Sequence, residues 1–321
     1  MKNWTITKHI IWRLWNQMFQ YAAVRAFQIK NWYKESQVFL DFSEVYKRSN
    51  EKFYNDLKDF NIKCSQEIRY KNTIMQTFLI FCSNLLKYIC LFTTKRDYYD
   101  VKFYKLWKKF QPLLNKFWLY IFRLWFCDFK DSNAKDKIFY WTFESAKYFD
   151  NIRDVLLEEF TPKYDILAHN IDLYNEIKKS ESVCVTIRRW DFVDNSAQKK
   201  HLYVCTPKYF KDAIEYIRNK IPNAKFFVFS DDVERCKKNM EFPIWTLFES
   251  WTDPVWEKLR LMYSCKHFII SNSTFSWRAQ YLSKSKNKIV IAPSRRCNHT
   301  YKDNWEQLDV YMDNWTLIDV G

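Results

Sequence analysis

Apolar residues in the second half of the chain alternate between short continuous runs and segments with helical spacing. The continuous runs predict buried strands at residues 183–188, 225–230, 267–271 and 288–292. The intervening segments predict helices at residues 207–220, 231–240, 254–264 and 273–283. Strands that are apolar throughout and separated by helices are typical of a parallel sheet covered on both faces.

The first half opens with a similar alternation. Residues 5–12 and 37–41 have strand character, and 16–31 carry apolar residues at helical spacing. A strand–helix–strand unit is therefore predicted, and with the second half it indicates an α/β protein of two lobes, 1–165 and 166–321. The first corner is unusual because Trp12 and Trp15 stand where such corners usually need a residue without a Cβ atom.

The segment near residues 70–130 has a different composition, in which aromatic residues alternate with lysine and arginine. Two helices, at 74–94 and 103–126, are predicted to pack on the N-terminal lobe. An alternative is that a basic, aromatic helix lies in a membrane interface. A transmembrane span fits less well because Gln76 and Lys87 interrupt the first apolar segment.

Composition narrows the choice of partners. Hydrophobic residues make up 48% of the 321 residues, as in a globular protein, and the formal net charge is +15. A protein with this positive charge favours binding to an anionic partner: nucleic acid, a phosphorylated small molecule or an acidic membrane surface.

The nine cysteines form no CxxC pair and the five histidines do not cluster, so no metal site is predicted. Without a signal-peptide pattern, a cytoplasmic protein is expected, with peripheral contact to the inner membrane face as an option.

Glycine is almost absent. A chain of this length ordinarily carries about 22 glycines, at a usual frequency of about 7%. This chain has one, Gly321, together with 15 tryptophans. The deficit suggests that some tryptophans occupy glycine positions.

Polar residues follow three of the predicted strands of the second half, where parallel sheets bind ligands. Arg188 and Arg189 could grip a diphosphate, although an arginine there could equally pair with a surface carboxylate. Of Asp231 and Asp232, one is expected to cap the helix that follows, Asp231 being the assigned cap, and the other to accept hydrogen bonds from a base or ribose.

The third strand end is rich in hydroxyl groups and precedes a helix. Hydroxyls together with backbone N–H groups at a helix N-terminus form an anion site, and simple capping would need only one of them. The candidates are Ser273, Thr274 and Ser276.

Three motifs give the chain a family resemblance. Residues 12–22, WRLWNQMFQYA, match the Gly-x-x-Gly-Asn-Gln-Met-Phe-Gln-Tyr-Ala corner of the α-1,2-fucosyltransferases of glycosyltransferase family 11, except at the two glycines. Residues 188–191, RRWD, resemble the Arg-Arg-Gly-Asp motif of that family. Residues 271–277, SNSTFSW, resemble its serine-rich motif.

This resemblance implies a GT-B-like fold with two Rossmann-like lobes, the donor on the C-terminal lobe and the acceptor mostly on the N-terminal lobe. It implies an inverting galactoside 2-α-L-fucosyltransferase of surface glycan synthesis. The enzyme would move L-fucose from GDP-β-L-fucose to the 2-hydroxyl of a galactose-terminated glycan without a metal or other cofactor.

The resemblance also implies residue roles. Arg188 and Arg189 would neutralise the leaving GDP, Ser273, Thr274 and Ser276 would bind phosphate, and Asp231 or Asp232 would hold the guanosine. Asn16 and Gln17 would face the sugar and acceptor. Asp191 and Asp41 are candidate bases on position only, and Thr186 stands where many relatives carry histidine.

The departures from the family pattern run in two directions. Tryptophan replaces glycine at Trp12, Trp15, Trp32, Trp141 and Trp190, and arginine replaces tryptophan at Arg235, Arg278 and Arg296. We interpret this as a variant genetic code in which UGA encodes glycine and some CGR codons encode tryptophan.

Two other classes of protein stay open. An inactive, transferase-like binding protein would follow from bulky rings at positions 12, 15 and 190. A basic nucleic-acid-binding protein would account for the charge, but no recognised module is visible, so no nucleic-acid partner is expected.

Overall fold

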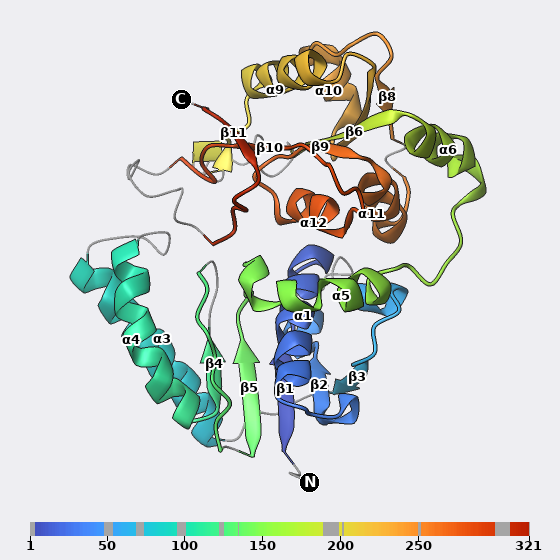
Figure 1. Ribbon diagram of the computed structural model, residues 1–321. Helices are drawn as coiled ribbons and strands as arrows, with labels where there is room; N and C mark the ends of the chain where they lie inside the picture. The colour runs from blue at the N-terminus through green and yellow to red at the C-terminus, as the bar shows by residue number, and fades with distance from the viewer. Residues whose placement is uncertain are drawn as a thin grey trace. The chain divides into compact units, whose positions relative to one another are not determined.

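The computed structural model (Figure 1) describes residues 4–47, 54–68, 74–94, 101–121, 125–133, 135–188, 199–200, 202–249, 252–298 and 309–320. The chain divides into two compact units. Unit 1 comprises Met1–Phe160 with Gln307–Tyr311, and unit 2 comprises Thr161–Glu306 with Met312–Gly321. The first division thus falls a few residues before the expected position 165, and a short C-terminal stretch returns to unit 1.

Unit 1 contains a five-stranded parallel sheet in the order β3-β2-β1-β5-β4. Its strands are β1 (Thr5–His9), β2 (Val38–Asp41), β3 (Gln66–Ile68), β4 (Leu119–Ile121) and β5 (Asp136–Tyr140). Its helices are α1 (Leu14–Lys30), α2 (Ser43–Lys47), α3 (Ile74–Thr94), α4 (Val101–Lys116) and α5 (Arg153–Glu159). The predicted strand–helix–strand opening is therefore present as β1, α1 and β2.

A buried ion pair fastens α1 to α5. The Arg25 guanidinium donates to Glu159 Oε1 through Nε at 3.0 Å and through Nη2 at 2.8 Å. The Tyr21 hydroxyl donates to the other carboxylate oxygen, so both oxygens of this buried group are used. Because an unpaired buried charge is costly, these three side chains fix the position of α1 against α5.

The second predicted helix of the middle segment is wrong in its C-terminal part. Helix α4 ends at Lys116, and the residues that follow form β4, which pairs in parallel with β5. The continuous apolar run at Leu119–Ile121 is fully buried, and a buried strand and a buried helix look alike over three residues. Within the described residues, no helix is long and apolar enough to cross a membrane.

Unit 2 contains a six-stranded parallel sheet in the order β11-β10-β9-β6-β7-β8. Its strands are β6 (Glu181–Ile187), β7 (Ala224–Ser230), β8 (Leu247–Phe248), β9 (His267–Ile269), β10 (Val290–Pro293) and β11 (Thr316–Ile318). Its helices are α6 (Ile171–Lys179), α9 (Pro207–Lys220), α10 (Val233–Asn239), α11 (Val255–Ser264) and α12 (Thr274–Leu282).

The core of unit 2 explains why its elements follow the sequence pattern closely. Strand residues Val183, Val185 and Val228 pack with Ile214 and Ile217, which recur three residues apart on α9. Two parallel sheets flanked by helices confirm the predicted α/β, Rossmann-like architecture of both lobes.

Five described residues other than glycine have a positive φ, and four of them are tryptophans. The values are 73° at Trp12, 57° at Trp32, 71° at Trp118, 80° at Trp141 and 52° at Phe143. All five lie in unit 1. Trp15, by contrast, lies in the first turn of α1 and has no positive φ.

Candidate active site

The carboxyl ends of β6 and β7 bring two predicted site residues into contact. These strands are in register with Ile187 opposite Ser230, so the next residues, Arg188 and Asp231, lie side by side. Arg188 Nε is 3.2 Å from Asp231 Oδ2, and the two side chains are 23% and 7% exposed. Sequence analysis offered two roles for Arg188, pairing with a carboxylate or binding a diphosphate. The arginine does pair with a carboxylate, and its side chain is also partly exposed, as binding a diphosphate would require.

The two aspartates have different roles, and the cap is not the expected one. Asp232, not Asp231, caps α10 by accepting a hydrogen bond from Arg235 N at 3.1 Å. The Ser230 hydroxyl accepts from Asp232 N at 3.0 Å and fixes the turn. The helix begins two residues later than expected because its N-cap is Asp232, whereas Asp231 directly follows the last residue of β7.

The serine-rich segment precedes α12. Ser273 is the N-cap, and its hydroxyl accepts a hydrogen bond from Phe275 N at 3.3 Å. Ser276 is buried and shares a 2.9 Å hydrogen bond with Ser271, while Thr274 is 8% exposed. The buried Ser276 therefore stabilises the segment through its hydrogen bond to Ser271. Ser273 is the N-cap and Thr274 the first residue of the helix.

Two residues that the sequence analysis did not assign to the site hold this edge together. The Thr186 hydroxyl accepts from Ser271 N at 3.2 Å, which ties the end of β6 to the segment after β9. The Asn272 amide donates to Leu202 O at 2.9 Å and to Arg296 O at 2.7 Å. The partners of Asn272 are 70 and 24 residues away in the sequence, so no local pattern could have identified this role.

Glu249 is a third residue that sequence reasoning missed. It follows β8, next to the end of β7, and its backbone N–H donates to Val228 O at 3.1 Å. Its carboxyl group is buried, and this burial raises its pKa to about 8, although Lys258 opposes the shift. A carboxyl group that stays protonated near neutral pH can donate a hydrogen bond.

In unit 1, glutamine side chains hold the corner between β1 and α1. The Gln20 amide bonds both the N–H and the carbonyl of Ile11, at 3.0 and 2.9 Å. Gln17 is also buried; its amide donates to Trp12 O at 2.9 Å and Tyr54 O at 3.0 Å and accepts from Asp56 N. These bonds make Gln17 a positioning residue for the corner.

The N-terminus of α1 carries two further polar side chains. Asn16 lies in the first turn and is 5% exposed. The Asp56 carboxyl accepts a backbone hydrogen bond from Leu14, the first residue of the helix. Desolvation by burial raises the pKa of Asp56 to about 6, with a further increase from Asp59 and an opposing effect of Arg13. Sequence reasoning missed Asp56 because only the fold brings it to this helix end.

Asp41 lies at the carboxyl end of β2 as a partner of His9. His9 Nδ1 is 2.8 Å from Asp41 Oδ2, and both side chains are buried. Burial by itself would raise the pKa of Asp41, but hydrogen bonds from His9 and Ser43 lower it overall. A carboxylate stabilised in this way is a weak base, so the environment suits Asp41 to orienting His9.

Two of the predicted site residues, Arg189 and Asp191, lie outside the described residues, as does Trp190. Within the part of the chain that the structure describes, no group of three His, Cys, Asp or Glu side chains is placed to hold a metal ion.

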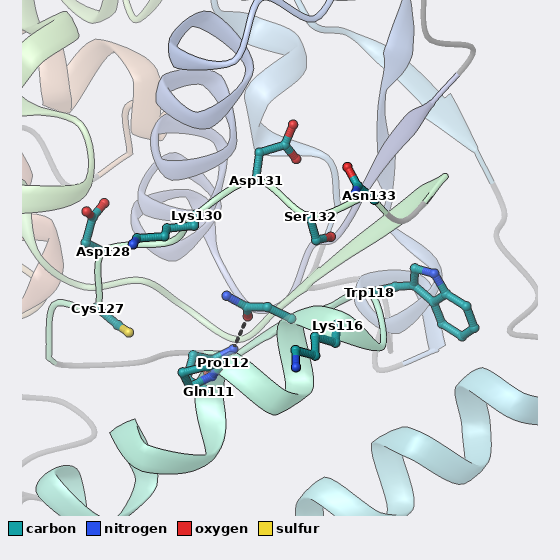
Figure 2. A pocket seen from close by; sticks show the side chains of 11 residues that line it. Gln111, Pro112, Lys116, Trp118, Cys127, Asp128, Lys130, Asp131, Ser132 and Asn133 are labelled. Atoms are coloured by element: carbon teal, nitrogen blue, oxygen red, sulfur yellow. Dashed lines mark hydrogen bonds between the residues drawn. The ribbon is translucent and has the colours of Figure 1, made fainter.

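A hollow of about 740 Å³ lies in unit 1, lined by residues from the end of α4 and from the loop before β5. Figure 2 shows Lys116, Lys130, Asp131 and Trp118 around it. Trp118 precedes β4 and Asp131 precedes β5, so the hollow lies at the amino ends of these strands. Ligands of parallel sheets bind at the carboxyl ends, and the predicted site residues lie there instead.

The sequence matches known proteins over most of its length. The profile of glycosyl transferase family 11 matches residues 77–319. An α-1,2-colitosyltransferase of Escherichia coli is 36% identical over 161 residues, which cover 47% of this chain and 53% of that protein. The O-antigen biosynthesis glycosyltransferase WbnK of Escherichia coli is 28% identical over 88% of this chain and 91% of its own. The chain thus aligns with about half of the colitosyltransferase and nearly all of WbnK.

Solved structures agree on the fold. A crystal structure of the NodZ α-1,6-fucosyltransferase with GDP superposes with a TM-score of 0.51 and 12% identity, covering 87% of this chain and 92% of that one. A second NodZ structure, soaked with GDP-fucose, gives a TM-score of 0.50. At this identity the likeness supports a GT-B-like fold, with two parallel sheets flanked by helices, and no more.

Proposed function

Because the chain belongs to glycosyl transferase family 11, we propose that it transfers L-fucose from GDP-β-L-fucose to the 2-hydroxyl of a terminal galactoside, with inversion. The observation that carries this proposal is the pair Arg188–Asp231 at adjoining strand ends of unit 2, 3.2 Å apart. An arginine whose orientation is fixed by a carboxylate and which still reaches the surface is suited to bind a diphosphate.

In this proposal the donor lies along the carboxyl edge of the unit 2 sheet. Arg188 stabilises the charge that develops on the leaving GDP, and Asp231 positions the guanidinium. Ser273 and Thr274 supply hydrogen bonds to phosphate at the start of α12, Arg189 is a second cation, and Asp232 keeps its role as helix cap. The residues themselves supply the positive charge, so the proposal includes no metal.

We propose Asp56 as general base in place of Asp41, with Asp191 as the alternative. A base works best when its pKa lies near the working pH, and the pKa of Asp56 is raised to about 6 while that of Asp41 is lowered. Asp56 also lies at the same helix end as Asn16, the proposed acceptor residue.

Colitosyl transfer is the second candidate, favoured by the 36% identity to the colitosyltransferase. Colitose is fucose without its 3-hydroxyl, so the two donors differ by one polar group. A site that hydrogen-bonds this hydroxyl would reject the analogue strongly, whereas an apolar site would not.

The test is a competition assay on the full chain prepared in two forms, as written and with glycine at positions 12, 15 and 190. GDP-fucose and GDP-colitose are offered with a β-galactoside acceptor, and NMR identifies the linkage and anomer of the product. An α-1,2-fucoside supports the proposal, and a preference for GDP-colitose replaces it with the second candidate. GDP binding without turnover in both forms leaves an inactive, transferase-like binding protein, and absence of both turnover and GDP binding rejects the transferase.

The role of Asp56 has its own measurement. We expect kcat/KM to rise with pH through about 6 in the unmodified chain, because the base must be deprotonated. Asp56→Asn should lower kcat by about 10² to 10⁴ and remove this rise, while GDP affinity stays unchanged. If Asp56→Asn keeps the acidic limb of the profile, Asp191 is the better candidate.

A further inference from the structure

A stripe of apolar side chains on α3 is exposed to solvent. Six large residues on this helix are 48–85% exposed: Phe78, Phe81, Leu85, Tyr88, Ile89 and Phe92. At 3.6 residues per turn they fall within an arc of about 100° on one face of the helix. Single exposed apolar residues are ordinary, but a continuous stripe indicates a surface that binds a partner.

The charge around this stripe indicates what kind of partner it is. Helices α3 and α4 contact each other and contain no aspartate or glutamate. Helix α4 presents exposed lysines at positions 105, 108, 109 and 116. Figure 1 shows the two helices lying side by side, next to β4. An apolar, aromatic stripe beside a purely basic helix is complementary to an anionic lipid surface, where rings enter the headgroup layer and lysines meet phosphate.

We infer that α3 and α4 bind the chain to the surface of an anionic membrane without crossing it. Helix α3 is not apolar enough to span a bilayer, while an amphipathic stripe of this width suits the interface. The inference does not depend on which sugar is transferred.

The test is co-flotation of the full chain with phosphatidylcholine vesicles, with and without about a third of phosphatidylglycerol. We expect binding to the anionic vesicles that weakens with salt and weak binding to the neutral ones. The double variant Phe81→Ser/Phe92→Ser should reduce binding at least tenfold, and each of Lys105→Glu and Lys109→Glu about fivefold or more. Ile244→Ser, at a residue 91% exposed in unit 2, is the matched control and should have no effect.

Three results would overturn the inference. The first is failure to bind anionic vesicles. The second is equal binding to both vesicle types. The third is a dimer in light scattering that Phe81→Ser/Phe92→Ser dissociates, which would make the stripe a contact between two copies.

A second inference rests on an independent observation, the backbone of the tryptophans. Helix α1 ends in a complete Schellman motif, in which Trp32 N donates to Ile29 O at 3.2 Å and Tyr33 N to Gln28 O at 3.1 Å. Trp32 is therefore the C′ residue, at φ 57°, the position that glycine usually occupies. Its side chain is 93% exposed, so no packing offsets the strain.

Trp118 repeats this arrangement after α4. Its φ is 71°, and its N–H donates to Asn115 O at 3.2 Å, as expected of a C′ residue. Trp12 and Trp141 have φ of 73° and 80° just after β1 and β5. A bulky residue in this region is a true outlier, and four tryptophans share it.

Two other tryptophans serve as a contrast. Trp107 and Trp277 are buried in helices, and Trp277 stacks on Tyr281 with ring centroids 4.9 Å apart. Arg278 shows the opposite mismatch, because its guanidinium is fully buried against the rings of Trp277 and Tyr281, at 5.3 and 5.7 Å. That environment suits an aromatic side chain better than a charge. Arg235, in contrast, is 43% exposed beside Asp232, and its surroundings do not call for tryptophan.

We infer that the source cell makes this protein with glycine at positions 12, 32, 118 and 141 and tryptophan at 278. This requires that the genetic code of the source cell assigns UGA to glycine and CGA or CGG to tryptophan. Position 118 follows from the backbone alone, because it belongs to no recognised motif. Trp15 and Trp190 are assigned by motif only, since one is helical and the other lies outside the described residues.

The gene decides this directly. We expect UGA codons at positions 12, 32, 118 and 141, UGG at 107 and 277, and CGA or CGG at 278. UGG at positions 32 and 118 would overturn the inference.

Thermal unfolding gives a second measurement. Trp32→Gly and Trp118→Gly should each raise the melting temperature by about 2 to 8 °C, because they relieve a left-handed backbone. Trp277→Gly is the matched control and should lower it. A lower melting temperature for both Trp32→Gly and Trp118→Gly would contradict glycine at these positions.

Discussion

The two units secure their turns in different ways. In unit 1, four turns depend on a left-handed backbone at Trp12, Trp32, Trp118 and Trp141, and α1 begins without a side-chain cap from its N-cap residue. In unit 2, the side chains of Thr206, Asp232 and Ser273 cap the N-termini of α9, α10 and α12. No positive φ occurs at a residue of unit 2 that the structure describes.

This difference shows which part of the chain tolerates a change of residue at its turns. A side-chain cap is local, and a single serine or aspartate supplies it. A left-handed turn instead needs the absence of a Cβ atom, so its residue type is dictated by the backbone. The fold of unit 1 is therefore more sensitive to the identity of its turn residues.

The largest expected effect concerns the buried anchor of unit 1. Arg25→Met leaves the Glu159 carboxylate buried without its cation and should lower the free energy of unfolding by about 3–5 kcal/mol. Lys30→Met is the matched control, because the Lys30–Asp128 pair is exposed and contributes about 0–1 kcal/mol. Urea unfolding measures both. Equal effects of the two variants would show that unit 1 does not rely on its buried pair.

The next effect concerns function at the edge of unit 2. Arg188→Ala should lower kcat/KM by about 10² to 10³ through loss of charge stabilisation on the leaving group. Stability should also fall, because the variant leaves the Asp231 carboxylate, only 7% exposed, without its cation, so kcat/KM is measured at a temperature at which both proteins are folded. Arg218→Ala, at an exposed position on α9, is the control and should keep full activity. Full activity of Arg188→Ala would remove the central residue of the proposed site.

Glu249 should make the stability of unit 2 depend on pH. Its folded pKa of about 8 lies above its ordinary value of 4.5, so the folded state holds a proton that the unfolded state releases. Its contribution is therefore fully present below about pH 4.5 and is lost as pH rises towards 8, by at most about 1.4 kcal/mol per pH unit.

The variant Glu249→Gln isolates this contribution. The difference in unfolding free energy between Glu249→Gln and the unmodified chain should grow in favour of the variant up to about pH 8 and then level off. Glu241→Gln, at a side chain 85% exposed, should show no such trend. A difference that is constant with pH would show that Glu249 is already ionised in the folded protein.

The smallest effect tests the side-chain caps. Ser273→Ala should cost about 1 kcal/mol of unfolding free energy because the Phe275 N–H loses its acceptor. Ser273→Asn retains a capping oxygen and should restore most of this. If Asn does not rescue stability, α12 does not depend on its cap and the contrast with unit 1 weakens.

Much of unit 2 could be predicted from the sequence because its strands are continuous apolar runs and α9 has clear helical spacing. The strand β4 was missed because three buried residues give no period. The sequence also could not show which of Asp231 and Asp232 caps α10, because the choice depends on the residue at which β7 ends. Asp56 and Glu249 became candidates only once burial was known, because a pKa shift has no pattern in the sequence.

The sequence by itself determined the α/β alternation, the family motifs and the anomaly of one glycine among 15 tryptophans, because each of these is a matter of residue type and spacing. Tertiary structure decided which residues meet. It joined Arg188 to Asp231 and Asp41 to His9, and it brought Asp56 to the start of α1. It also distinguished tryptophans in left-handed turns from tryptophans in the core, because φ and burial are properties of the folded chain.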